Sequence, residues 1–206
     1  MARPVSIRDE DILDAAREVF LAHGIRATSA MVAERARVSE GIIFRRFKTK
    51  DGLFRAALDL DLVDPPEIAD LEQRVGQGTV VDNLHDAGVA LVGILRLLVP
   101  LNVLALSNPS RSGPIGSRAR PNPREAYSSI LANYTRGEVA LGRLRDVDPD
   151  LFACAFIGGI NDYVVGQTFR ADTTPLRALT VPAFIRALLD LLMRGAQLTP
   201  EPPRRR

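Results

Sequence analysis

Four cations lie close together in the segment from residue 45 to residue 50, and their chemistry suits a phosphate-rich partner. Arg45 and Arg46 are adjacent, and Lys48 and Lys50 are the two lysines of the chain. An arginine can bind a guanine edge or a phosphate with two hydrogen bonds, whereas a lysine binds phosphate as a point charge. A charge run by itself is more often a solvated surface. The cations therefore indicate a nucleic-acid site only if a defined element positions them.

The positive charge of the chain is concentrated around these residues. The first 56 residues contain 11 basic and 8 acidic side chains, whereas the remaining 150 contain 16 basic and 17 acidic ones. Between Arg35 and Lys50 there are six basic residues and one acid, Glu40. A locally basic segment in a nearly neutral chain favours an acidic polymer as the partner of that segment.

The chain before this segment predicts an amphipathic helix. Apolar residues recur on one face between residues 6 and 23, and acidic residues from Asp9 onward suit the positive end of the helix dipole. Ser6 is expected to cap this helix, and Gly24 is expected to end it.

Two further short helices are predicted after Gly24. One fits residues 30–36, with Thr28 or Ser29 as its N-cap, and the next begins after Ser39. Only three residues separate them. Two short helices joined in this way form the outline of a helix-turn-helix.

The third helix has an exposed surface that is unusual for an ordinary solvated face. Ile43 and Phe47, one turn apart, are expected to be buried. Gly41 lowers helix propensity by about 1 kcal/mol relative to alanine, but it lets the backbone come close to another surface such as a DNA groove. The residues expected to face solvent are Glu40, Gly41, Ile42, Arg45 and Arg46, and Phe44 is expected at the edge of this exposed face.

A fourth helix is predicted to begin next to Lys50, with Thr49 as its cap. The helix dipole disfavours a cation at this end by about a few tenths of a kcal/mol. A phosphate bound between Lys50 and the helix N-terminus would reverse that balance. Lys50 is therefore expected to bind phosphate.

The combination of these motifs resembles the DNA-binding domain of TetR-family transcriptional regulators. The resemblance covers residues 8–58 and rests on Gly24 followed by "ATS", "VAERA", "VSEG", "RRF" and a lysine followed by an acid and a leucine. It implies DNA contacts from a recognition helix and phosphate contacts beside it. The residues at the matching positions are Ser39, Glu40, Gly41, Ile42, Phe44 and Arg46 for the recognition helix, and Thr28 and Lys50 for phosphate.

The sequence departs from the family pattern at several positions. Arg37 stands where the tight turn usually has glycine, and a left-handed arginine costs on the order of 1 kcal/mol, although its charge could reach a phosphate. Phe44 replaces a usual tyrosine, and Ile42 replaces a common threonine. The second helix also looks one residue shorter than usual. These departures support an alternative, in which the protein is a helical dimer that binds a ligand or protein and has lost specific DNA binding.

The whole chain is expected to be all-α, with two domains and a tail. Residues 1–56 form the three-helix DNA-binding domain, residues 57–198 form a helical ligand-binding and dimerisation domain, and residues 199–206 form a disordered tail. Pro100 is expected to bend the longest helix. The helices expected in the second domain cover residues 67–75, 80–106, 124–141, 149–169 and 181–195.

A small, largely hydrophobic effector is expected to bind in the second domain. Polar groups beside apolar stretches could line its pocket, or they could be ordinary side chains at the edge of the core. The candidates for the pocket are Tyr127, Tyr134, Asn161, Tyr163 and Gln167.

The last two helices are apolar around much of their circumference, which suggests a homodimer. The family resemblance implies that they pair in a four-helix bundle. The candidate interface residues are Phe152, Phe156, Gly159, Phe184, Leu188 and Leu192.

No catalytic constellation is visible, and neither a metal nor a cofactor is expected. His23 and His85 have no neighbours at metal-ligand spacing, so an enzyme is the weakest hypothesis. The single Cys154 is expected to be a buried, inert thiol. The longest apolar run is short for a membrane span and contains Arg96, which with the acidic start of the chain suggests a cytoplasmic protein.

The leading hypothesis is a DNA-binding regulator. A dimer would bind a palindromic operator in double-stranded DNA as a repressor, and a small hydrophobic molecule would release it.

Overall fold

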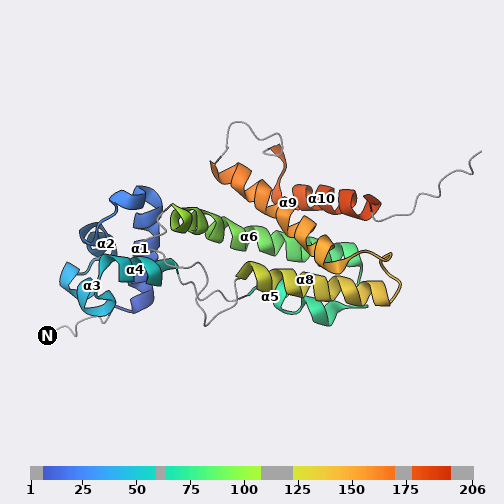
Figure 1. Ribbon diagram of the computed structural model, residues 1–206, viewed down its shortest axis with the longest axis horizontal. Helices are drawn as coiled ribbons and strands as arrows, with labels where there is room; N and C mark the ends of the chain where they lie inside the picture. Colours follow the sequence, from blue (N-terminus) through green and yellow to red (C-terminus); the bar gives the residue numbers. More distant parts are fainter. Residues whose placement is uncertain (1–6, 59–63, 108–122, 170–177, 196–206) are drawn as a thin grey trace, which may run out of the picture. The chain divides into compact units, whose positions relative to one another are not determined.

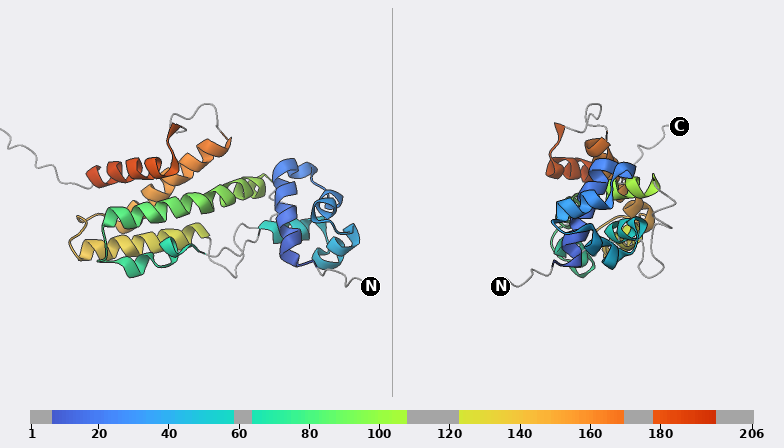
Figure 2. Two further views of the ribbon diagram at one scale, coloured as in Figure 1. Left: turned by 180° about the vertical axis from the view of Figure 1, so that it is seen from behind. Right: turned by 90° about the vertical axis from the view of Figure 1, so that its left-hand side faces the viewer.

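The structure is a computed structural model of the 206-residue chain, and it describes residues 7–58, 64–107, 123–169 and 178–195 (Figures 1 and 2). The described residues form helices and connecting turns, as the all-α prediction requires. Two compact units can be distinguished. The elements in chain order are α1 (Asp9–His23), η1 (Gly24–Arg26), α2 (Ser29–Ala36), α3 (Glu40–Phe47), α4 (Lys50–Leu58), α5 (Pro66–Ala69), η2 (Leu71–Arg74), α6 (Val80–Leu106), α8 (Pro123–Ala140), α9 (Pro149–Phe169) and α10 (Val181–Gly195).

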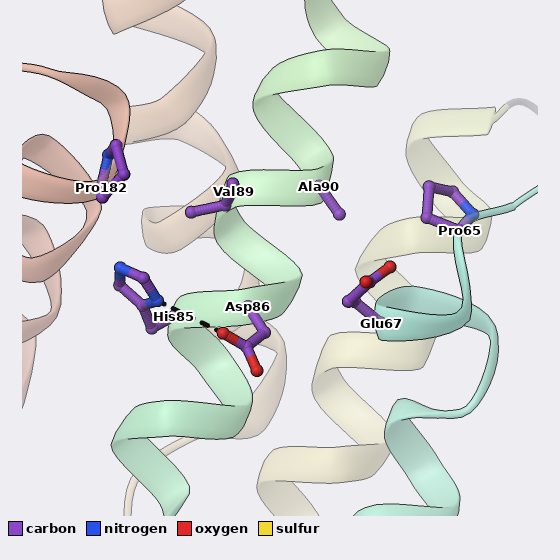
Figure 3. A pocket seen from close by; sticks show the side chains of 7 residues that line it. All are labelled: Pro65, Glu67, His85, Asp86, Val89, Ala90 and Pro182. Atoms are coloured by element: carbon purple, nitrogen blue, oxygen red, sulfur yellow. Dashed lines mark hydrogen bonds and ion pairs between the residues drawn. The ribbon is translucent and has the colours of Figure 1, made fainter.

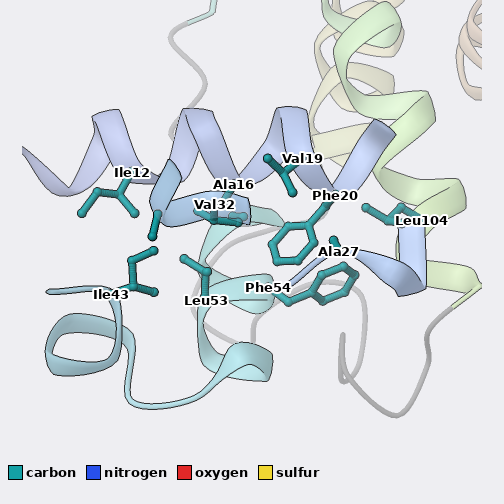
Figure 4. Packing of buried hydrophobic residues seen from close by; sticks show 12 residues of the cluster. Ile12, Ala16, Val19, Phe20, Ala27, Val32, Ile43, Leu53, Phe54 and Leu104 are labelled. Atoms are coloured by element: carbon teal, nitrogen blue, oxygen red, sulfur yellow. The ribbon is translucent and has the colours of Figure 1, made fainter. Parts of the chain in front are cut away.

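The first unit contains α1 to α4 and the last residues of α6, from Leu98. Its core is a single apolar cluster in which Ile12 of α1, Ile43 of α3 and Leu53 of α4 are fully buried (Figure 4). Phe20 and Phe54 meet edge to face, with ring centroids 4.9 Å apart. This core fixes α3 against α1 and α4, since each of the three helices contributes side chains to it.

The sequence locates the helix ends of this unit well, with one correction. Asp9, Glu10 and Asp11 occupy the first turn of α1, and Gly24 follows the helix with φ of 54°. The N-cap position is Arg8. A carboxylate oxygen of Asp11 accepts a hydrogen bond from the backbone N–H of Arg8 at 3.1 Å, while the expected cap, Ser6, lies outside the described residues.

The helix-turn-helix has the predicted three-residue turn. Thr28 caps α2, and its Oγ1 accepts a hydrogen bond from the backbone N–H of Met31 at 3.2 Å. Arg37 ends α2 in the left-handed region, with φ of 56° and ψ of 43°. Its N–H donates to the carbonyl of Glu34 at 3.1 Å, and the N–H of Val38 donates to the carbonyl of Ala33 at 2.9 Å. These bonds close the end of α2 and require the backbone conformation that glycine adopts most easily.

Replacing Arg37 with glycine is therefore expected to stabilise the protein by roughly 1 kcal/mol, because the left-handed conformation costs an arginine about that amount. Urea unfolding of the variant should show a higher midpoint with an unchanged slope. A comparison substitution of Arg35 with glycine, in the last turn of α2, should lower the midpoint, since glycine is a poor helix former and the ion pair with Glu18 is lost. An unchanged or lowered midpoint for Arg37→Gly would show that the turn holds arginine without strain.

The second unit consists of α5, η2, α6 up to Leu97, α8, α9 and α10. Figure 1 and the left-hand view of Figure 2 show α6, α8 and α9 side by side, and Nδ2 of Asn83 on α6 donates a hydrogen bond to the Tyr134 hydroxyl of α8. Gly88 lets α6 approach its neighbours closely, because a Cβ there would lie 2.8 Å from Ile185 of α10 and 2.9 Å from Phe156 of α9. Burial of these apolar faces holds the unit together.

The helix boundaries in this unit agree closely with those expected from the sequence. The helix expected over residues 67–75 is divided into α5 and η2. α6 continues through Pro100 as one helix, and its last residues belong to the first unit, where Leu104 joins the apolar core. The sequence-based prediction places a single domain boundary after residue 56, whereas the first unit also contains the residues of α6 from Leu98 onward. The expected tail, residues 199–206, lies outside the described residues.

In the described part of the chain, one helix, α6, is long and apolar enough to cross a membrane by length and composition alone. The core helix of a soluble protein passes the same test. Of the apolar window in α6 that passes this test, 28% is buried inside the structure, and Leu84 and Leu91 are among the buried residues of the helix.

Candidate nucleic-acid interface

The exposed side of α3 carries a glycine, an aromatic ring and an arginine. Gly41 is exposed in the first turn, Phe44 is 42% exposed, and Arg45 is exposed in the last turn. Ile43, on the opposite side, is 1% exposed. A helix with this arrangement can approach a groove closely at its N-terminal end and offer a cation further along, which is the geometry that major-groove recognition requires.

Arg46 does not belong to this exposed side, contrary to the sequence-based prediction. Its side chain is 23% exposed, and its Nη1 lies 2.6 Å from Oδ1 of Asp9 in the first turn of α1. The physical reason is the helical step of about 100° per residue, which places Arg46 beside the buried Ile43 and Arg45 opposite to it. Of the two arginines that the sequence predicts to be exposed on this helix, Arg45 faces outward and Arg46 does not.

Two other predicted recognition residues are also engaged within the protein. The carboxylate of Glu40 accepts a hydrogen bond from the hydroxyl of Ser29, which ties the first turn of α3 to the first turn of α2. Ile42 is half-buried and packs at the edge of the core. Ser39 occupies the N-cap position of α3, where its side chain makes no capping hydrogen bond and is exposed.

The cations near α3 differ in their partners. Arg35 is paired with Glu18 of α1. Lys48 is exposed, and its Nζ donates to the carbonyl of Arg45 at 3.2 Å. Within the described residues, Arg37 and Arg45 are exposed and have no ion pair, so they are the arginines most available to an external anion.

The start of α4 is built as the sequence predicts. Oγ1 of Thr49 accepts a hydrogen bond from the backbone N–H of Gly52 at 2.9 Å, which caps the helix. Lys50 is the first residue of α4 and is half-buried. Gly52 is required here, because a Cβ would lie 2.3 Å from the carbonyl oxygen of Phe47. This close approach holds the first turn of α4, where Lys50 lies, against the end of α3.

Two of the residues predicted to line a ligand pocket, Tyr127 and Tyr134 of α8, are buried and hydrogen-bonded within the protein. The Tyr127 hydroxyl donates to Oδ1 of Asp64 at 2.8 Å, and burial with this carboxylate raises the Tyr127 pKa above its usual value. The Tyr134 hydroxyl accepts from Nδ2 of Asn83 at 3.1 Å, and burial raises the pKa of Tyr134 to about 12. Both tyrosines are buried and neutral, and they anchor α8.

The remaining three residues predicted to line a pocket belong to α9. Tyr163 is buried and stacks on Phe184 with ring centroids 4.0 Å apart, while its hydroxyl donates to the carbonyl of Leu179 at 3.0 Å. Asn161 is exposed and Gln167 is half-buried. None of the five predicted residues is among the described residues that line the cavity of about 510 Å³ in the second unit.

A cavity of about 510 Å³ that opens to solvent lies in the second unit. Figure 3 shows the side chains that line it. Two carboxylates lie in it, Glu67 and Asp86, and within the described residues Glu67 has no ion-pair partner. Asp86 is 3.4 Å from Nδ1 of His85 and 3.9 Å from Nη1 of Arg74. The cavity is lined by Pro65, Glu67, His85, Asp86, Val89, Ala90 and Pro182, from α5 and the residue before it, α6 and α10.

Sequence reasoning missed this cavity because it sought aromatic residues in later helices. Nε2 of His85 is buried and has no hydrogen-bond partner within the described residues. Adjacent His85 and Asp86 in a polar stretch of an otherwise apolar helix were the available signal. No group of three His, Cys, Asp or Glu side chains in the described ranges is arranged to hold a metal ion.

Most of the predicted dimer residues are buried within one subunit. Phe152, Phe156 and Phe184 belong to its core. Gly159 lets Leu188 pack against it, because a Cβ at Gly159 would lie 3.0 Å from the Leu188 methyl groups. Leu192 is half-buried. Other residues of α9 and α10 are exposed on the outer sides of these two helices.

The outward faces of α9 and α10 carry leucines and small residues at helical spacing. Leu151 is 68% exposed and Leu191 is 69% exposed. Cys154, predicted to be buried, is exposed on α9. The residues that continue these two faces are Ala155 and Gly158 on α9, and Ala183 and Ala187 on α10.

Comparisons with known proteins place the chain in a family. A family model described as bacterial regulatory proteins, tetR family, matches residues 12–57. An uncharacterized HTH-type transcriptional regulator of Bacillus subtilis strain 168, YvkB, is 49% identical over 181 residues, which cover 87% of this chain and 89% of the relative.

Solved structures share the fold at lower sequence identity. The TetR-family regulator PfmR of Thermus thermophilus is 22% identical, with a TM-score of 0.63 over 91% of this chain and 99% of that one. FadR of Bacillus subtilis, in complex with stearoyl-CoA, is 19% identical, with a TM-score of 0.60 over 92% and 100%. SmeT, the repressor of a Stenotrophomonas maltophilia multidrug efflux pump, is 21% identical, with a TM-score of 0.62 over 96% and 98%. With its helix-turn-helix and its extensive similarity to YvkB, the chain belongs to the TetR family and is a transcriptional regulator of that family.

Proposed function

We propose that the protein is a cytoplasmic, homodimeric repressor that binds a palindromic operator and is released by a small molecule. The observation that carries the DNA-binding part is the exposed side of α3, where Gly41, Phe44 and Arg45 point away from the core. Two such helices related by a twofold axis would enter successive major grooves of a palindrome.

In this proposal the cations have two kinds of contact. Arg45 reads a base edge from α3, while Arg37 and Lys50 hold phosphates on either side of it. Thr28 and Ser39 are exposed at the starts of α2 and α3, where their hydroxyls can also bind phosphate. Arg46, Glu40 and Ile42 keep α3 in position through their contacts within the protein.

Operator binding is tested by selecting DNA from a random duplex library with the wild-type protein. Enrichment of a palindrome whose half-sites are about one helical turn apart, or a multiple of it, supports the proposal. Failure to enrich any sequence would favour the alternative in which the helical dimer binds a ligand or a protein partner. Phe44 and Ile42 would then explain the loss, because neither offers a hydrogen-bonding side chain.

The dimer is proposed to form through the outward faces of α9 and α10. Small residues at positions such as Ala155, Gly158 and Ala187 let helices approach closely, and the exposed Leu151 and Leu191 gain from burial. The same faces of two subunits would form a four-helix bundle.

The effector is proposed to bind in the cavity of the second unit. Pro65, Val89 and Ala90 offer an apolar surface, while Glu67 and Asp86 offer negative charge. An apolar molecule with a positive charge or hydrogen-bond donors fits this lining. The phosphates of an acyl-CoA, such as the stearoyl-CoA in the FadR complex, would be repelled by the same two carboxylates.

This charge preference can be measured with two probes of matched size and opposite charge. Tetraphenylphosphonium is expected to raise the melting temperature of the wild-type protein and to weaken its binding to the selected DNA, whereas tetraphenylborate should do neither. Glu67→Gln should weaken phosphonium binding by about 1 kcal/mol, because Glu67 is half-buried and solvent screens its charge. The matched control is Glu125→Gln, which removes an exposed carboxylate on α8. Stronger binding of the borate would contradict this assignment of ligand charge.

A further inference from the structure

The pair between Arg46 of α3 and Asp9 of α1 has a consequence for DNA specificity. We infer that Asp9 is a specificity-determining residue: it holds Arg46 in an ion pair and so keeps one cation of the recognition helix from binding the phosphates of any DNA sequence. The inference rests on the DNA binding proposed above. It concerns a residue on α1, outside the helix-turn-helix.

The geometry of the pair is set by the core of the first unit. Ile12 lies one turn after Asp9 on α1, and Ile43 lies one turn before Arg46 on α3. Both isoleucines are buried in the same apolar cluster (Figure 4). Because the two helices are fixed by this packing, the carboxylate and the guanidinium are held close together at 2.6 Å. The helix dipole also favours a carboxylate in the first turn of α1, where Asp9 lies.

Arg46 and Arg45 therefore differ in what they can do in an encounter with DNA. Arg45 is exposed and without an ion pair in the described part of the chain, so it can bind DNA without losing a contact. Arg46 must leave Asp9 before it can bind a phosphate. It would also leave that carboxylate uncompensated beside a polyanion. Complexes with random DNA, which depend mostly on phosphate contacts, are weakened by this cost.

A specific complex depends less on an additional phosphate contact and more on the position of α3. The Asp9 pair joins α3 to α1 and so helps to fix that position. Loss of the carboxylate would therefore add a free cation, which helps every complex, and remove a positional restraint, which harms the specific complex. The ratio of operator affinity to random-DNA affinity is expected to fall.

The test compares Asp9→Asn with wild type on two 30-base-pair duplexes, one random and one selected by the wild-type protein from a library. Titrations at several salt concentrations should show random DNA bound about three- to tenfold more tightly by the variant, with a salt slope steeper by roughly two per dimer. The selected duplex should gain less, so that the specificity ratio falls. Asp9→Glu, which keeps the charge, should restore the wild-type ratio and slope.

Two controls separate the ion pair from a general charge effect. Glu34→Gln removes an exposed carboxylate from α2 that has no partner in the described ranges, and it should change random-DNA binding less than Asp9→Asn does. In an Arg46→Ala background, Asp9→Asn should have no more effect than Glu34→Gln. Equal effects of the two single variants, or an undiminished effect of Asp9→Asn without Arg46, would overturn the inference.

A purely structural role for Asp9 gives a different result. Asp9→Asn would then weaken binding to both duplexes in parallel and leave the salt slope unchanged, which would also overturn the inference. Enrichment of a DNA sequence by the wild-type protein is measured first. That step tests the proposed function separately, because it does not depend on any Asp9 variant.

Discussion

Replacing Arg45 with alanine is expected to abolish base discrimination at one position in each half-site of the operator. A bidentate contact between arginine and guanine contributes about 1 to 3 kcal/mol of discrimination, and a symmetric dimer loses two such contacts. Binding to the selected duplex should therefore fall by far more than binding to random DNA. Mobility-shift titrations on duplexes with each base substituted in turn would locate the affected position.

Two variants with the same loss of charge serve as comparisons for Arg45→Ala. Lys50→Ala should weaken binding to all sequences about equally and reduce the salt slope by roughly one per lost phosphate contact. Arg55→Ala, on the exposed side of α4, should have little effect on either duplex. If Arg45→Ala and Lys50→Ala reduce specific and random binding by the same factor, Arg45 does not read a base.

The assignment of the reading role to Arg45 shows how far the sequence can predict this site. The short turn between two short helices and the cap at Thr49 follow from local residue types, and the structure has both. The difference in exposure between Arg45 and Arg46 depends on the orientation of an eight-residue helix. With Ile43 as the buried centre, the helical step of about 100° places Arg45 outward, so the orientation was within reach of the sequence. The partner of Arg46 was not, because Asp9 lies 37 residues earlier in the chain.

The sequence predicts the helices of the second unit well, but it does not show which side of each helix is buried and which is exposed. α9 has apolar residues around most of its circumference, so periodicity does not distinguish Phe152, which is buried, from Leu151, which is exposed. Tyrosines beside apolar stretches were equally ambiguous. Tyr127 and Tyr134 have hydrogen-bond partners that lie 63 and 51 residues earlier in the chain. Such distant contacts decide which polar groups remain available to a ligand.

The double substitution of Leu151 and Leu191 with glutamate is expected to dissociate the proposed dimer. Both leucines are mostly exposed in one subunit, so glutamate can be accommodated there without disturbing the core. In a twofold interface, each substitution would place charges in the apolar contact from both sides. Sedimentation at micromolar concentration should give half the mass of the wild-type particle, with an unchanged circular dichroism spectrum.

Dissociation should affect DNA binding more strongly than any change within the helix-turn-helix. Two linked recognition helices bind a palindrome with an avidity that can exceed that of one helix by about 10²- to 10⁴-fold. The monomeric variant should lose affinity for the selected duplex by a factor in this range and keep its binding to a single half-site. Val81→Glu provides the matched control, since Val81 is 41% exposed on α6, where a carboxylate suits the first turn. If the double variant remains a dimer, the subunits pair through surfaces other than the exposed leucines of α9 and α10.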